Sequence, residues 1–487
     1  MNFKSLAKDT LIYGASDFVT KFIAFFTFPI IASVLSAKEF GILELVNTVT
    51  MLTAMLANVG MNNAVSLFYW DVNTDKSDRE KIISSGLFVL MAVSLVIVGV
   101  IAVFIQVNPF SVVNFFDPIT KIGLTLAFLV MATTQWNQYC MDITRLNFSP
   151  WKFFGISIST RIFSLLAGLV AILYLNLGID GLLGGQALSL ILLVPFAIYS
   201  IKSEVSATAI TSEWIKKLVK IGYPYIFASL AYWLFSSMDR WMLAAFSSVE
   251  ETGIYSVAFR FSSVILFISM AFGQSWSPVA VKLKADYPQE YRELYGKVLI
   301  YLLFMMTFVG GFLSLFAPEI ILWIMPKAYF ASALPLVMLS FAVVFQSSQQ
   351  VTMIGISLEK KTMLFSRIAW IAALTNLVLN YLFIPSWGAL GAAIATAISF
   401  LVLTILYFYF TQKLHPIVVQ KTPLIFLVIA VLVFLGTSFV MLDNEIDGVT
   451  ILVKLGILLG YGLIGMRVLH LTSFFPLIKQ KLSDLVR

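Results

Sequence analysis

Three cationic residues lie deep inside long apolar stretches of this sequence. Lys21 lies in "DFVTKFIAFF", Arg161 in "STRIFSLLAG" and Arg260 in "GIYSVAFRFSSVILFISMAF". At 1.5 Å per helical residue, each lies about 12–18 Å from the end of its stretch. A charge at such a depth in a bilayer costs about 2.5–3.5 kcal/mol on insertion scales. If these cations line a wet cavity, they can bind an anion, because the forked donors of arginine match phosphate oxygens. The alternative for Arg260 is an acidic partner on a neighbouring helix.

Carboxylates in apolar stretches are candidates for carrying a proton or a coupling ion. The candidates are Glu44, Asp17 and Asp239. Asp17 precedes Lys21 by four residues, which is also the spacing of a salt bridge on one helix face. The shallow depth of Glu44 also fits a solvated side chain. No GxxxxGK[ST] sequence occurs in the chain, so we expect no P-loop nucleotide site and no ATP-driven step.

Two further arginines are secondary candidates for the anion site. Arg240 follows Asp239 near one end of its stretch, and Arg367 lies about one turn from the end of another. Long side chains near helix ends reach the lipid headgroups, so snorkelling is the alternative for both. Lys454 and Arg467 are interpreted as interfacial residues. The motifs predict no catalytic residue, no metal site and no cofactor.

The composition predicts the elements that must position these side chains. The 487 residues are 60% hydrophobic and 12% charged, whereas soluble proteins have about 25% charged residues. We therefore expect an all-α polytopic membrane protein whose first apolar stretch is retained as a span. Stretches of about 20 apolar residues predict about fourteen transmembrane helices. Their approximate ranges are 10–35, 41–68, 83–106, 119–142, 153–176, 181–201, 221–246, 253–276, 298–322, 331–358, 363–384, 389–411, 423–442 and 449–470.

The distribution of lysine and arginine predicts the orientation. With a cytoplasmic N-terminus, 22 of the 32 Lys and Arg residues fall on the cytoplasmic side, three in the outer connections, and the others inside spans. We therefore expect a multi-pass protein of the bacterial cytoplasmic (inner) membrane with both termini in the cytoplasm. The outer connections are short, and no segment is long enough for a soluble domain.

An internal repeat predicts two bundles of six helices each. "LSAKEFGILELV" (35–46) matches "SSVEETGIYSVA" (247–258), so that Glu39 aligns with Glu251. A second match aligns Arg161 with Arg367. The expected parts are residues 1–205, residues 206–415 and an appended helix pair with a tail at 416–487. Two such halves are typical of transporters that bind substrate between them.

The layout resembles the MOP superfamily, which includes MATE drug exporters, lipid II flippases and Wzx-type polysaccharide flippases. The stretches that carry the resemblance are "FPIIASVLSAKEFGILELV", "SSMDRWMLAAFSSVEETGIYSVAFRFSSV" and "NYLFIPSWGALGAAIATAISF", and they are most similar to the Wzx type. The resemblance implies that an undecaprenyl-diphosphate-linked oligosaccharide, an O-antigen or capsule repeat unit, moves to the outer leaflet by alternating access. Lipid II flippases carry cavity-facing cations in helices 1 and 8, where Lys21 and Arg260 lie here. Those relatives have several arginines in helix 1, and this chain has one lysine.

Three alternatives stay open at this stage. A lipid II flippase would share the mechanism and differ in the sugar. A MATE-type exporter of organic cations would favour buried acids over Lys21, Arg161 and Arg260. A membrane polymerase or ligase would need a large outer loop, so we expect no enzyme. The expected partners are a lipid-linked oligosaccharide, membrane lipids and other polysaccharide-assembly proteins, with no nucleic acid and no nucleotide.

Overall fold

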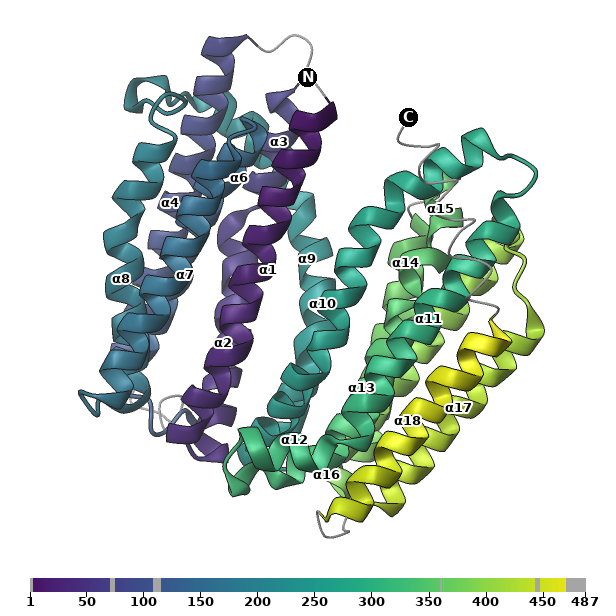
Figure 1. The fold of residues 1–487 in the computed structure, drawn as a ribbon. Helices are drawn as coiled ribbons and strands as arrows, with labels where there is room; N and C mark the ends of the chain where they lie inside the picture. Colours follow the sequence, from purple (N-terminus) through teal and green to yellow (C-terminus); the bar gives the residue numbers. More distant parts are fainter. Residues whose placement is uncertain are drawn as a thin grey trace. The chain divides into compact units, whose positions relative to one another are not determined.

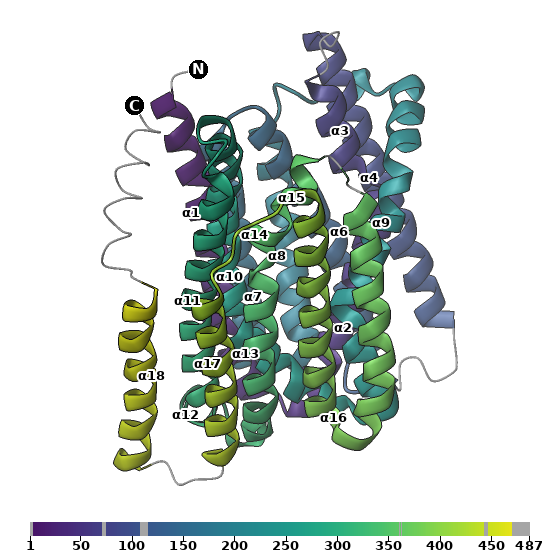
Figure 2. The ribbon, with the colours of Figure 1, turned by 90° about the vertical axis from the view of Figure 1, so that its right-hand side faces the viewer.

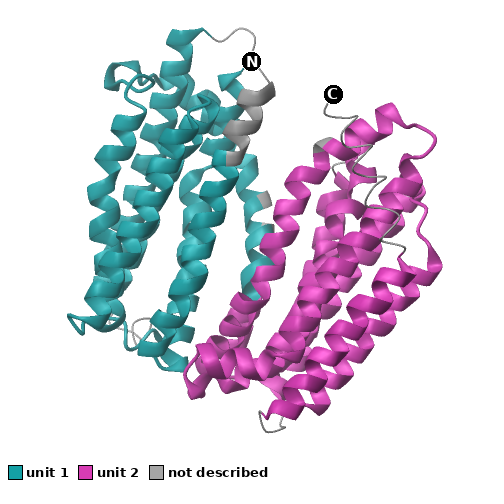
Figure 3. Cartoon of the chain, viewed as in Figure 1, with its two compact units in different colours: residues 1–238 teal, residues 239–487 magenta. Residues whose placement is uncertain are grey.

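A computed structural model describes residues 3–70, 75–107, 115–359, 361, 363–442 and 447–469, and these residues form helices and turns without a strand. The chain divides into two compact units (Figure 3), unit 1 at Met1–Met238 and unit 2 at Asp239–Arg487. The boundary between the units falls within helix α9 (Ser212–Phe246). The sequence-based boundaries at residues 205 and 415 stay predictions.

Unit 1 is a bundle of long helices around an apolar core. Its helices are α1 (Phe3–Val34), α2 (Ala37–Asn58), α3 (Met61–Tyr69), α4 (Lys76–Val107), α6 (Lys121–Leu146), α7 (Pro150–Leu173), α8 (Gly178–Ser200), the 3₁₀ turn η1 (Ala207–Ala209) and most of α9. Helix α6 packs against α2, α4, α7 and α8, and α1 packs against α7. Buried side chains such as Ile82, Tyr139 and Phe153 form the core.

Unit 2 is a second helical bundle with a pair of helices at its C-terminal end (Figure 1). Its helices are the end of α9, α10 (Val249–Asp286), α11 (Tyr291–Leu315), α12 (Ala317–Ile324), η2 (Lys327–Ser332), α13 (Ala333–Ser347), α14 (Gln349–Thr352), α15 (Ile354–Leu358), α16 (Met363–Leu414), α17 (Lys421–Val440) and α18 (Gly448–Val468). Helix α13 packs against α10, α11 and α16, whereas α17 and α18 pack against α11.

Eleven helices in the described part are long and apolar enough to cross a membrane, or twelve if bent α9 counts as one span. Helix α16 is two helices joined at a kink, where Gly388 has φ +50°, and Figure 2 shows its two arms turning back on each other. Helix α6 is not in this set, because Gln135, Asn137 and Gln138 lower its hydropathy. The polytopic all-α fold is confirmed, whereas the number fourteen stays a prediction.

The two stretches matched in the sequence repeat begin helices in the same way. Ser36 caps α2 and accepts a hydrogen bond from the Glu39 backbone N–H, and Ser248 caps α10 in the same way with Glu251. The matched glutamates therefore share the third position of a helix, where acids are favourable. Their carboxylates differ: that of Glu39 accepts from the Ser36 N–H at 2.8 Å, whereas that of Glu251 accepts from the Ala389 N–H at 2.7 Å.

A break separates α2 from α3 in unit 1. Val59 and Gly60 both have positive φ, at 48° and 68°. A Cβ placed on Gly60 would lie 2.2 Å from the Gly222 carbonyl oxygen, and one on Gly222 would lie 2.2 Å from the Val59 carbonyl oxygen. Because only glycine leaves room for this approach, the break is held against α9. The break also brings the side chains of Asn58 and Asn62 together.

Lys454 forms a buried ion pair that attaches α18 to the rest of unit 2. Its Nζ lies 2.6 Å from Oε1 of Glu319 on α12, and the two side chains are 2% and 0% exposed. The interfacial interpretation of Lys454 is therefore wrong. The reason is that its partner is 135 residues away in sequence, on a short helix that apolar length does not predict. Arg467, in the last turn of α18, is exposed.

We predict that Lys454→Met lowers the free energy of unfolding by about 3–5 kcal/mol, because Glu319 is left charged and buried without its partner. The measurement is thermal stability of the purified protein in detergent. The double variant Lys454→Met/Glu319→Leu is expected to regain most of the loss. The control is Lys297→Met, which removes the partially exposed pair with Glu293 and is expected to cost less than about 1 kcal/mol. Equal losses in the two single variants would contradict the assignment.

Candidate functional site

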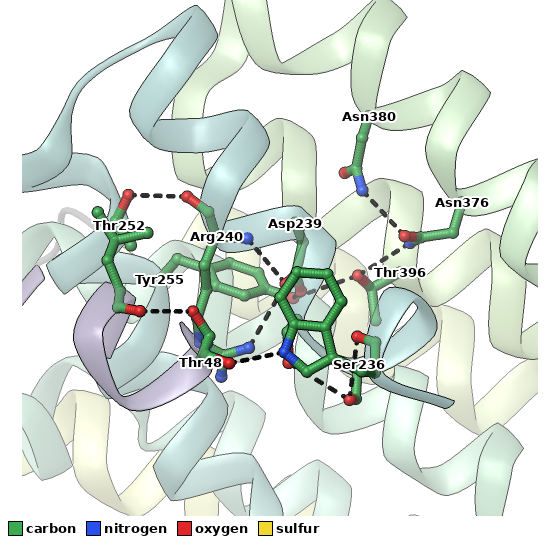
Figure 4. Close-up of polar contacts among 12 residues, drawn as sticks. Thr48, Ser236, Asp239, Arg240, Thr252, Tyr255, Asn376, Asn380 and Thr396 are labelled. Carbon is green, nitrogen blue, oxygen red and sulfur yellow. Dashed lines mark hydrogen bonds and ion pairs between the residues drawn. The ribbon is translucent and has the colours of Figure 1, made fainter. Parts of the chain in front are cut away.

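Asp239 is the centre of a buried polar network in unit 2 (Figure 4). The Tyr255 hydroxyl on α10 donates a hydrogen bond to the Asp239 carboxylate and lies 3.2 Å from the Thr396 hydroxyl. Asn376 donates to Thr396 at 3.4 Å, and Asn380 donates to Asn376 at 3.0 Å. The network therefore joins α9 and α10 to both arms of α16.

Arg240 belongs to the same network and does not snorkel. The residue is 7% exposed, and its guanidinium lies 3.4 Å from the Asp239 carboxylate. It also lies 5.0 Å from the ring centroid of Phe259 and 5.8 Å from that of Tyr255. The snorkelling alternative for Arg240 is therefore wrong, because neighbouring rings of α10 and the adjacent carboxylate surround the guanidinium.

The Asn380 end of this network contains a hydrogen-bond acceptor without a partner among the described residues. Asn380 is fully buried, and its side-chain carbonyl oxygen accepts no hydrogen bond from the described residues. A buried polar atom without a partner is rare and calls for a reason, such as a bound ion or water. Carboxylate, hydroxyl and amide oxygens together are the ligands that hard cations prefer.

Unit 1 contains a second polar network, between α2, α3 and α6. The Asn58 amide donates to Asn62 at 3.0 Å and to Gln135 at 3.2 Å. The Asp142 carboxylate accepts from Asn62 at 2.6 Å and from Gln138 at 3.0 Å. Gln135, Gln138 and Asp142 follow the 3–4 spacing of one helix face. The network is part-buried, and its members come from the break after α2 and from the C-terminal half of α6.

Three amides of this network keep open hydrogen-bonding capacity. Asn58, Gln135 and Gln138 are half-buried, and one end of each amide has no partner among the described residues. The charges of Arg145 and of Asp17 on α1 also act on Asp142. Amides and carboxylates with open positions at a part-exposed surface suit a ligand that carries many hydroxyl groups.

The three predicted cations lie well inside their helices. Lys21 is 18 residues after the start of α1, and Arg161 and Arg260 are each 11 residues after the start of α7 and α10. All three are half-buried. Lys21 and Arg161 lie on helices that pack against each other within unit 1. The convergence of Arg260 with them on one cavity stays a prediction, because Arg260 belongs to unit 2.

The remaining candidates have different surroundings. Glu44 is 6% exposed and accepts a hydrogen bond from Asn47, so the solvated alternative for Glu44 is wrong. Asp17 is half-buried, and its backbone carbonyl accepts a hydrogen bond from the Thr20 hydroxyl at 3.0 Å; its pairing with Lys21 stays a prediction. Arg367 is exposed near the start of α16, and its guanidinium contacts the Met363 sulfur at 3.6 Å. Arg367 is thus the only secondary candidate with a position that permits snorkelling.

Comparison with known proteins identifies the family. Residues 6–284, more than half of the chain, match the family described as polysaccharide biosynthesis protein. The chain belongs to this family. The match confirms the resemblance to polysaccharide-biosynthesis proteins that the sequence indicated.

Two relatives are similar to this chain over two thirds or more of its length, and a solved structure shares its fold. The probable low-salt glycan biosynthesis flippase Agl15 of Haloferax volcanii is 21% identical over 457 residues, 93% of each chain. The probable flippase AglR of the same organism is 27% identical over 345 residues, 67% of this chain and 70% of AglR. The lipid II flippase MurJ, in an inward closed conformation, has a similar fold, with a TM-score of 0.68 at 16% identity. That similarity covers 94% of this chain and 99% of MurJ.

Sequence reasoning missed the polar network of unit 1. A signal was present, because Gln135, Gln138 and Asp142 recur on one face of a helix that also contains Asn137. Asn376, Asn380 and Thr396 were missed for a different reason. Each is an ordinary polar residue by itself, and only the kink at Gly388 brings the two arms of α16 together around them.

Proposed function

We propose that this polysaccharide-family protein is a non-catalytic flippase of the cytoplasmic membrane. It moves a lipid-linked oligosaccharide from the cytoplasmic leaflet to the outer leaflet by alternating access of two bundles. The observation that carries the proposal is the set of half-buried cations in the middle of α1, α7 and α10. The match to the polysaccharide biosynthesis family and the relatives named as probable flippases also support a flippase. Both termini lie in the cytoplasm, and the lipid carrier is undecaprenyl diphosphate.

Arg260, Lys21 and Arg161 bind the diphosphate of the carrier lipid. A diphosphate is a dense anion, and charge-assisted hydrogen bonds from arginine to phosphate are roughly twice as strong as neutral ones. An exporter of organic cations would place acids at these depths instead. In this chain the cations occupy the middle of the helices, and the buried acid Asp239 has Arg240 beside it.

We predict that Arg260→Gln lowers the initial rate of lipid-linked oligosaccharide transport in proteoliposomes by about 10- to 100-fold, because one charge-assisted contact is lost. Arg260→Lys should retain part of the rate, and Lys21→Ala should reduce it as Arg260→Gln does. The control is Arg467→Gln at the exposed end of α18, which should transport normally. A wild-type rate for Arg260→Gln at normal protein level would remove Arg260 from the site. A large loss of thermal stability without a change in rate per folded protein would favour the acidic-partner alternative.

The amides of unit 1 contact the sugar. Asn58, Gln135 and Gln138 offer open donors and acceptors at a part-exposed surface, as described above. Sugar hydroxyls both donate and accept, so amides with a free end suit them. The Asp142 carboxylate fixes the orientation of Asn62 and Gln138 through the bonds that it accepts. In this arrangement the cations bind the diphosphate of the carrier lipid, and the amides recognise the glycan.

We predict that Gln138→Leu lowers transport of the lipid-linked oligosaccharide by about fivefold, the effect of one neutral hydrogen bond. Transport of the sugar-free polyprenyl diphosphate should not change, and this difference is the measurement. The matched control is Thr134→Val, an exposed neighbour on α6, which should affect neither substrate. Equal losses for both substrates would show that Gln138 acts on the fold and not on the sugar.

Asp239 carries the coupling ion or proton. Its carboxylate is 5% exposed, and the hydrogen bonds of Tyr255, Thr396 and Asn376 connect it to Asn380, whose side-chain oxygen has no partner among the described residues. A buried carboxylate that gains or loses a positive charge changes the energy of its whole network, because the surrounding dielectric is low. Binding of a proton or a monovalent cation there can thus favour one conformation. Glu44 and Asp17 remain the other candidates.

We predict that Asp239→Asn removes the stimulation of transport by an imposed ion or proton gradient while leaving downhill transport in place. The measurement is the ratio of rates with and without the gradient, which should fall close to one. The control is Glu293→Gln, a half-exposed acid on α11, which should keep the wild-type ratio. Glu44→Gln and Asp17→Asn are tested in parallel. A wild-type ratio for Asp239→Asn would exclude Asp239 as the carrier.

A further inference from the structure

The two arms of α16 form an open pocket at their free ends. Seven residues line a cavity of about 500 Å³: Lys361, Met363, Leu364, Arg367, Phe410, Lys413 and Leu414. Every charged residue in this lining is basic, and the others are apolar. None of the three cations belongs to an ion pair in the described part of the chain. The Lys413 ammonium lies 4.4 Å from the centroid of the Tyr409 ring, one turn earlier in the same helix.

An exposed apolar surface leads away from this pocket along both arms. On the first arm, Ile371, Leu374 and Val378 follow Arg367 on one helix face and are 47%, 55% and 56% exposed. On the second arm, Ile405 and Tyr409 precede Lys413 by eight and four residues and are 56% and 48% exposed. The three cations therefore lie at one end of an exposed apolar surface on α16.

We propose that this pocket binds the phosphate headgroup of an anionic phospholipid, whose acyl chain lies along the exposed face of α16. Basic pockets between helices at a membrane surface bind anionic headgroups, and apolar side chains provide the contact for the chain. A zwitterionic lipid fits less well, because its choline group would meet the same three cations. In the orientation predicted from the positive residues, the pocket faces the cytoplasmic leaflet.

The pocket lies at the ends of helical segments, unlike the cations proposed to bind the transported substrate. Lys21, Arg161 and Arg260 lie in the middle of their helices, whereas Arg367 is four residues after the start of α16 and Lys413 is one residue before its end. A resident lipid held there would bridge the two arms of α16, which also carry Asn376, Asn380 and Thr396. The proposal does not depend on the identity of the transported substrate.

The test is native mass spectrometry of the full-length protein titrated with phosphatidylglycerol and with phosphatidylcholine of the same chains. Wild-type protein should bind phosphatidylglycerol at least tenfold more tightly. The variant Lys361→Gln/Arg367→Gln/Lys413→Gln should lose affinity for it by about 100-fold, or roughly fivefold per cation. The matched control removes three cations from the start of α9, as Lys216→Gln/Lys217→Gln/Lys220→Gln, and should retain the wild-type affinity. Arg367→Gln alone, with an expected fivefold loss, replaces the triple variant if that variant fails to fold.

Four outcomes would overturn the proposal. Equal affinity for the two lipids would exclude headgroup recognition. An equal loss in the α9 control would reduce the effect to general surface charge. Displacement of phosphatidylglycerol by an equimolar polyprenyl diphosphate would assign the pocket to the transported lipid. Glycerol 3-phosphate, which lacks acyl chains, should not compete with phosphatidylglycerol. Competition at equal concentration would exclude a role for the exposed apolar surface of α16.

Discussion

Hydrocarbon solvates neither a charge nor an open backbone hydrogen-bonding group, and this constraint governs the whole molecule. Helices satisfy the backbone, which is why the described residues contain no strand. The charged side chains meet the constraint in distinct ways. Glu319 and Lys454 neutralise each other at 2.6 Å, and Asp239 shares its charge with Arg240 and Tyr255. Lys21, Arg161 and Arg260 are half-buried well inside their helices, and the proposed function gives their charges an anionic ligand.

The two polar networks differ in chemistry, and that difference supports different roles. The unit 1 network has amides around one carboxylate, is part-buried, and keeps amide ends open. The unit 2 network has a carboxylate, hydroxyls and amides, and its members are almost fully buried. A part-exposed network exchanges partners readily with an incoming polar ligand. A buried network responds to a small charge, because each of its hydrogen bonds is strong in a low dielectric. Sugar recognition therefore suits unit 1, and ion coupling suits unit 2.

The sequence predicted the helices well, because a bilayer requires about 20 apolar residues for each span. It did not predict where helices break, since the break at Val59 and Gly60 depends on Gly222 in a distant helix. Nor did it predict Glu319 as the partner of Lys454, because apolar periodicity contains no information on which helices meet. Within the candidate site, the sequence did predict that Arg260 lies well inside its helix. The amides around Asp142 could not be placed without the packing of α3 on α6.

The repeat also shows why alignment of two halves does not transfer a role. Glu39 and Glu251 share a helix-capping position, but only the Glu251 carboxylate reaches across to the N–H of Ala389 beside the α16 kink. Arg161 and Arg367 align in the same repeat, yet Arg161 is half-buried 11 residues into α7 and Arg367 is exposed four residues into α16. Depth in the bilayer decides the energy of a cation, and depth has diverged between the halves. The two proposals therefore assign different anions to the aligned arginines: a substrate diphosphate to Arg161 and a phospholipid headgroup to Arg367.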